Sequence, residues 1–82
     1  MTEELRIQLR TQLRQGCATV FDILFSEWCK EDESDDLRRS IIKWARGEPR
    51  VSGIGLFPGL IRLEIRPEEG GKPRVWASDK HP

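Results

Sequence analysis

Six basic residues are spaced so that they form two rows of positive charge. The rows are Arg6, Arg10 and Arg14 in the first segment and Arg39, Lys43 and Arg46 in the second. Residues three or four apart share one side of a helix, and such a row can follow the phosphates of a nucleic acid. Between the rows, however, residues 21–36 hold seven acidic residues and one Lys, and the whole chain is neutral, with 14 basic and 14 acidic residues. We therefore favour the interpretation that these basic side chains face solvent or another subunit. Binding of nucleic acid by the two rows is kept as the alternative function.

Residue types that carry catalysis or bind metal ions are scarce in this chain. His81 is the only histidine and stands next to the last residue, where chains usually fray. Cys17 and Cys29 show neither the CxxC nor the Cys/His spacing of a zinc site. The acidic run at residues 31–36 lacks the glycine and the closing Glu of a calcium-binding loop. We expect no catalytic residue, no metal, no cofactor and no enzymatic activity.

The length of 82 residues suits one small domain, which we place at residues 1–82. No apolar run approaches the roughly 18 residues of a membrane-spanning helix, so no membrane is expected among the partners. The first residues, Met1 to Glu4, are acidic and lack the basic and apolar regions of a signal peptide. Two cysteines are too few for a disulfide-rich secreted scaffold. These features predict a cytoplasmic protein.

An apolar stripe in the first third of the chain predicts one long helix at residues 3–30. Its members recur three or four residues apart, as an amphipathic helix requires: Leu5, Leu9, Leu13, Gly16, Cys17, Val20, Leu24 and Trp28. Phe21, Ile23 and Phe25 widen the apolar arc in the second half, which indicates burial by more than one neighbour. Gly16 stands between the two halves of this helix. We interpret it as a position where another backbone comes close, or as a residue that the helix tolerates at some cost in stability, in preference to a hinge.

A second, shorter helix is predicted at residues 35–46. Ser34 closes the acidic run and is the expected N-cap, because its hydroxyl can accept a hydrogen bond from a free backbone N–H. Gly47 and Pro49 are typical of the residues that end a helix.

The rest of the chain has the pattern of β-structure at residues 51–78. Leu60 to Arg66 alternates apolar and charged side chains, and a short strand is expected at residues 74–78, so we predict a hairpin at residues 60–78. Residues 79–82 are expected to fray.

A third strand at residues 51–57 would precede the hairpin. Pro58 and Gly59 then occupy the central positions of a type II turn between this strand and the next. The predicted fold class is α+β: a long N-terminal helix, a second shorter helix, and then a C-terminal antiparallel β-hairpin or three-stranded meander.

The expected function follows from the mismatch in length between the two helices. A helix at 3–30 would extend about 42 Å and the second helix only about 18 Å, so part of the leucine stripe would stay uncovered. Two antiparallel copies of the long helix would cover it, with a dimer interface made of Leu5, Leu9, Leu13 and Val20. The sequence therefore predicts a small non-enzymatic protein–protein interaction or regulatory module that forms a homodimer and has an unidentified protein partner.

Overall fold

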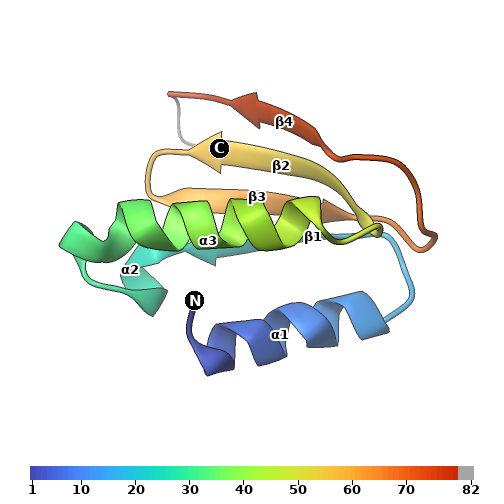
Figure 1. Ribbon diagram of the computed structural model, residues 1–82, viewed down its shortest axis with the longest axis horizontal. Helices are drawn as coiled ribbons and strands as arrows, with labels where there is room; N and C mark the ends of the chain where they lie inside the picture. The colour runs from blue at the N-terminus through green and yellow to red at the C-terminus, as the bar shows by residue number, and fades with distance from the viewer. Residues whose placement is uncertain (80–82) are drawn as a thin grey trace.

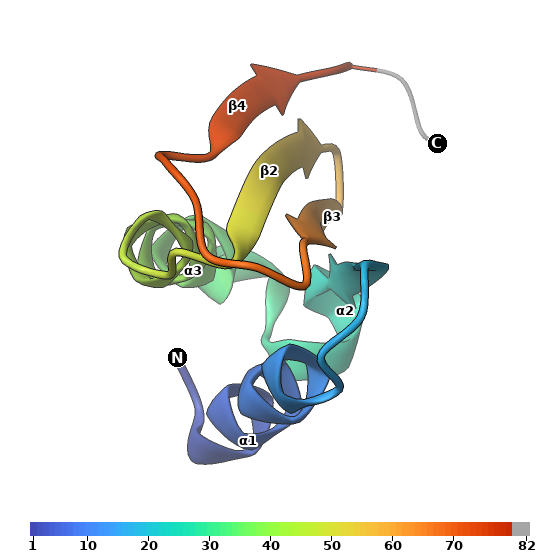
Figure 2. The same cartoon turned by 90° about the vertical axis from the view of Figure 1, so that its right-hand side faces the viewer.

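The computed structural model describes residues 1–79, in which helices cover one face of a four-stranded sheet (Figures 1 and 2). The elements in chain order are α1 (Glu3–Arg14), β1 (Thr19–Leu24), α2 (Phe25–Trp28), the 3₁₀ turn η1 (Glu31–Glu33), α3 (Ser34–Arg46), β2 (Val51–Phe57), β3 (Leu60–Ile65) and β4 (Arg74–Ala77). The predicted α+β class is confirmed. The expected frayed end, apart from Asp79, lies outside the described residues, and so does His81.

The strands lie side by side in the order β1-β3-β2-β4, so β1 and β4 are the two edges of the sheet (Figure 1). β3 is antiparallel to both of its neighbours, β1 and β2, whereas β4 runs parallel to β2. Figure 2 shows α1 and α3 on the same side of the sheet. No helix in the described part of the chain is long and apolar enough to cross a membrane.

The long helix expected at residues 3–30 is wrong beyond residue 14. Thr2 begins α1, because its hydroxyl accepts the N–H of Leu5 at 3.2 Å. The helix ends at Arg14, and Gly16 adopts φ +69°, a left-handed conformation that terminates helices and that glycine adopts without strain. The chain then reverses, and the residues that the stripe placed on a second helical half form β1.

The strand β1 accounts for the apolar residues that widened the apolar arc of the expected helix. Phe21, Ile23 and Phe25 are two residues apart, which is the period of a strand, and Ile23 is completely buried. Val20, Asp22 and Leu24 alternate with these residues and point to the opposite face, where Val20 is 55% exposed. Residues 19–24 pair in register with residues 60–65 of β3, which supplies the backbone hydrogen bonds that a helix would otherwise make internally.

The second helix is confirmed as α3, but its start differs from the prediction. Glu33, not Ser34, is the N-cap residue, and its side chain accepts the N–H of Lys30 at 3.0 Å. Ser34 is already the first residue of the helix, and its hydroxyl donates to the carbonyl of Glu31 at 2.9 Å. The acidic run is therefore folded as the turn η1 that leads directly into α3.

The third strand and its turn are confirmed, whereas the hairpin at 60–78 is wrong. Gly59 has φ +79°, as the third position of a type II turn requires, and β2 and β3 form the hairpin. Both sides of β3 are thus occupied, by β1 and β2, so β4 has no free edge of β3 to pair with. It pairs with the outer side of β2 instead, from Gly53 opposite Arg74 to Leu56 opposite Ala77.

Two arginines fix the loops at the end where β2 begins and β3 ends. Arg50 donates through Nη1 to the carbonyl of Leu13 and through Nε to the carbonyl of Arg66 at 3.0 Å. Arg66 in turn donates to the carbonyls of Pro49 and Gly71. These bonds tie the last turn of α1 to the sheet and direct the 66–73 loop across the start of β2.

Candidate functional site

The residues predicted for a dimer interface are divided between the core and the surface. Leu5 and Leu9 are completely buried within the single chain, as parts of the core beneath α1, and Leu13 is half-buried. The stripe does not project beyond the fold, because α1 is short and folds back over the sheet. Val20 alone of the four is exposed, on the edge strand β1.

The two basic rows do not form one surface. Arg6 of α1 and Lys43 of α3 line the same hollow of about 510 Å³, together with Trp44. Arg46 lines a different hollow, beside Lys72. Arg39 lies 3.6 Å from Asp36, and Arg10 and Arg14 stay exposed along α1. The structure therefore brings one pair of the predicted cations together and separates the others.

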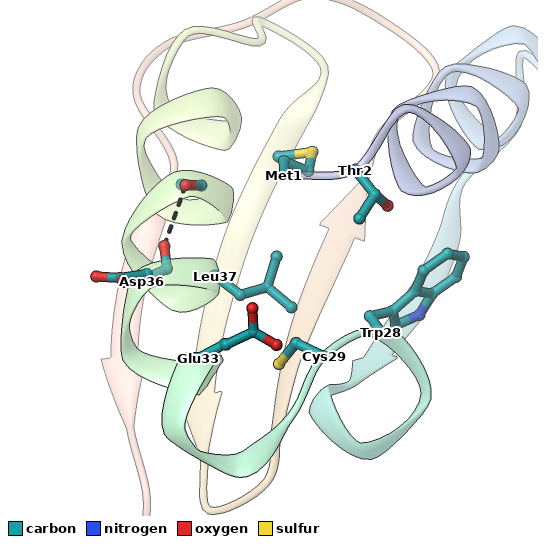
Figure 3. Close-up of a pocket in the computed structure, with 8 residues that line it drawn as sticks. Met1, Thr2, Trp28, Cys29, Glu33, Asp36 and Leu37 are labelled. Atoms are coloured by element: carbon teal, nitrogen blue, oxygen red, sulfur yellow. Dashed lines mark hydrogen bonds between the residues drawn. The ribbon is translucent and has the colours of Figure 1, made fainter.

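A neighbouring hollow of about 420 Å³ lies between the start of α1, the end of α2 and the first turns of α3 (Figure 3). Cys29, Glu33 and Asp36 line it, and Trp28 and Leu37 add apolar surface. A thiol beside carboxylates raises the question of nucleophilic or metal chemistry. Within residues 1–79, however, no three His, Cys, Asp or Glu side chains are grouped so that they could hold a metal ion.

The Cys29 thiol is held in its protonated form. Burial raises its pKa above the ordinary value, and the negative charges of Glu33 and Asp32 raise it further. Its Sγ also donates to the carbonyl of Phe25 at 3.5 Å. Because the thiolate is the nucleophile, this environment is the opposite of the electropositive one that activates a catalytic cysteine.

We expect Cys29 to react with a thiol reagent more slowly than the exposed Cys17 near neutral pH. Since the pKa of Cys29 is raised, the thiolate fraction at a given pH is smaller, and its reaction rate should reach half-maximum above the usual pH of about 8.5. The variant Cys17→Ser isolates this rate in a stopped-flow titration. A half-maximum below that pH would contradict the assigned environment.

The face of the sheet opposite the helices carries paired charges rather than a catalytic group. Arg62 forms a bidentate pair with Asp22, with distances of 2.8 and 3.0 Å, and this hydrogen bonding raises the pKa of the guanidinium. The same guanidinium lies 5.3 Å from the ring centre of Phe57. The one charge on β1 is therefore neutralised within the chain.

Trp76 of the parallel edge strand β4 packs its indole on this same face of the sheet. Its ring lies over Gly53 and Gly55, where a Cβ would come within 3 Å of the indole. Arg74 stacks on the indole at 4.9 Å and lies 3.7 Å from Glu64. These contacts fix β4 against β2 and β3, and Arg74 places a positive charge on this edge strand.

The other edge, β1, is open. Among residues 1–79 no strand pairs with its outer side. Val20 and Leu24, 55% and 39% exposed, stand on either side of Asp22 on the uncovered face. An unpaired edge flanked by exposed apolar side chains is a ready surface for another strand, and we take β1 as the candidate functional site.

Comparison with protein-family models, with curated proteins and with solved structures found no match to this chain. The choice of β1 as the candidate site is therefore based on the geometry of the strand alone. Of its residues, the sequence pattern singled out Val20 but placed it on a helix. The signal that identifies the edge strand is the spacing of two residues between Phe21, Ile23 and Phe25, shortly after Gly16.

Proposed function

We propose that the protein is a small non-enzymatic protein–protein interaction or regulatory module that self-associates through β1. The observation that carries this proposal is the open edge of β1, with Val20 and Leu24 exposed beside it. We place the proposed interface on this strand and no longer on the leucines of α1, because Leu5 and Leu9 are buried within one chain.

The composition of β1 supports pairing with another strand. Natural edge strands are usually protected by Pro, by Lys or by an unpaired charge that repels a partner. β1 has no Pro or Lys, and its one charge, Asp22, is engaged by Arg62 of the same chain. The raised pKa of Cys29 argues against this thiol as a nucleophile.

Val20→Lys is the variant that tests self-association. We expect light scattering at micromolar concentration to give twice the 9.5 kDa of one chain for the wild type and a single chain for the variant. The variant should stay folded, because Val20 is 55% exposed and lies opposite Glu64, which can pair with the new Lys.

Ile7→Lys is the matched control for that experiment. Ile7 is 53% exposed, nearly as much as Val20, but lies on α1. It should leave the dimer intact. A wild-type mass of one chain, or an equal loss of the dimer in both variants, would refute the proposal.

Nucleic-acid binding is the second candidate, and the hollow that Arg6 and Lys43 share with Trp44 is the observation that favours it. Glu48 lines the same hollow, and Arg39 is engaged by Asp36, so the positive surface is small. A titration with duplex DNA at low salt separates the two functions, because phosphate contacts are strongest there. Binding that Arg6→Gln with Lys43→Gln abolishes would favour the second candidate.

A further inference from the structure

The free backbone groups of β1 can be assigned residue by residue. The N–H of Phe25 donates to the carbonyl of Gly59 at 3.0 Å, across the pair of strands β1 and β3. Along a strand the N–H and C=O of successive residues point alternately to one side and the other. Phe21 and Ile23 therefore direct their backbone groups toward β3. Val20 and Asp22 direct theirs to the open edge, and so does the N–H of Leu24.

The turn between β2 and β3 gives the same assignment independently. In a hairpin with a two-residue loop, the residues that flank the loop form a hydrogen-bonded pair. Phe57 and Leu60 are that pair, so the backbone groups of Leu60 point toward β2 and away from β1. Leu24, which lies opposite Leu60, then directs its N–H to the outer side, whereas its carbonyl, at the N-cap of α2, accepts the first hydrogen bond of that helix.

We propose, building on the function proposed above, that the occupant of this edge is a second copy of β1, antiparallel, with a two-fold axis at Asp22. Val20 of each chain then lies opposite Leu24 of the partner subunit. Asp22 then forms both backbone hydrogen bonds with its own copy, and the N–H of Leu24 donates to the carbonyl of Val20 of the partner subunit. The two sheets become one continuous sheet.

The side chains match in this register on both faces. On the uncovered face the exposed Val20 and Leu24 each meet an apolar partner, which removes their surface from water. On the helix-covered face Phe21 lies opposite Ile23 of the partner subunit. The axis brings the two copies of Asp22 together, and like charges directly opposite are unfavourable, but each carboxylate already has a bidentate Arg62.

The competing antiparallel register has its axis at Phe21 and is less favourable. It keeps the faces of the sheet matched, but it sets the apolar Val20 opposite Asp22 of the partner subunit. Leu24 would then face a residue that precedes the strand, so the outer groups of β1 would be only partly paired. A shift by a single residue would invert the faces and place Ile23 against the exposed side.

Disulfide formation between single cysteines measures the register. In a background of Cys17→Ser and Cys29→Ser, Asp22→Cys should link to its own copy, since opposite Cα atoms about 5.5 Å apart suit a disulfide. Val20→Cys and Leu24→Cys should each fail to link alone, because each cysteine is displaced from its own copy by about 14 Å along the strands. A mixture of these two variants should link, and non-reducing gels report each product.

The mixture of Val20→Cys and Leu24→Cys tests the register while the pair of Asp22 and Arg62 stays intact. A folding defect in Asp22→Cys would therefore not decide the result. Linking of Val20→Cys with Asp22→Cys, with no link of Asp22→Cys alone, would assign the competing register and overturn this inference while the proposed self-association stands. The absence of any linked pair in a protein that light scattering shows to be dimeric would also overturn it. A monomeric wild type would refute the proposed function itself.

Discussion

Leu9→Ala should lower the free energy of unfolding by about 2–5 kcal/mol, the usual cost of removing a large apolar side chain from a packed core. Leu9 is completely buried and is one of only two buried residues on α1. A small domain has a total stability of about 5–15 kcal/mol, so this loss is a large fraction of it. Urea denaturation followed by circular dichroism measures the change.

Ile7→Ala is the control for this prediction, because Ile7 lies on the same helix and is 53% exposed. Surface substitutions of this kind usually change stability by less than about 0.5 kcal/mol. The comparison also tests the earlier idea that Leu9 joins two chains. If Leu9→Ala left the unfolding of each chain unchanged and only weakened association, Leu9 would belong to an interface and the packing of α1 described above would be wrong.

Gly55→Ala should destabilise the protein by about 1–3 kcal/mol, the typical cost of adding a methyl group to a closely packed site. A Cβ at this position would lie 2.6 Å from the indole of Trp76 and 2.9 Å from the ring of Phe57. Since the indole lies directly over the glycine, we expect β4 to separate from β2. The measurement is hydrogen exchange, with loss of protection at the N–H of Ser78, which donates to Leu56.

Gly71→Ala is the matched control, because nothing lies within 4 Å of the position where its Cβ would be. It should leave both stability and exchange unchanged. In a double-mutant cycle, Trp76→Ala should relieve part of the cost of Gly55→Ala, since the overlap is with that indole. Full additivity of the two substitutions would show that the ring does not rest on the glycine.

Local patterns were sufficient where one short segment carries the whole signal. The helix predicted at residues 35–46 follows from its apolar spacing and its stop at Gly47, and the β2–β3 turn follows from Pro58 and Gly59. The alternation in Leu60–Ile65 predicts a strand with one buried face, which the structure shows. These elements were predictable because their backbone conformation is determined by residues next to one another.

The segment from Gly16 to Trp28 was ambiguous, because its apolar residues satisfy both a helical and a strand period. Spacings of three and four include Val20 and Leu24, whereas spacings of two include Phe21 and Ile23. Pairing with β3, some 40 residues away, decides between them. Misplacing this strand on a helix also placed the candidate dimer interface on buried leucines.

What the sequence by itself determined is the α+β class, the presence of α3 and its end before Gly47, and the tight turn between β2 and β3. What only the tertiary structure decided is which side of each strand is occupied. β1 and β2 take both sides of β3, β4 pairs with the outer side of β2, and within the described residues the outer side of β1 remains open. The reason is physical: hydrogen bonds between strands join residues far apart in the chain, so no local spacing of side chains determines them.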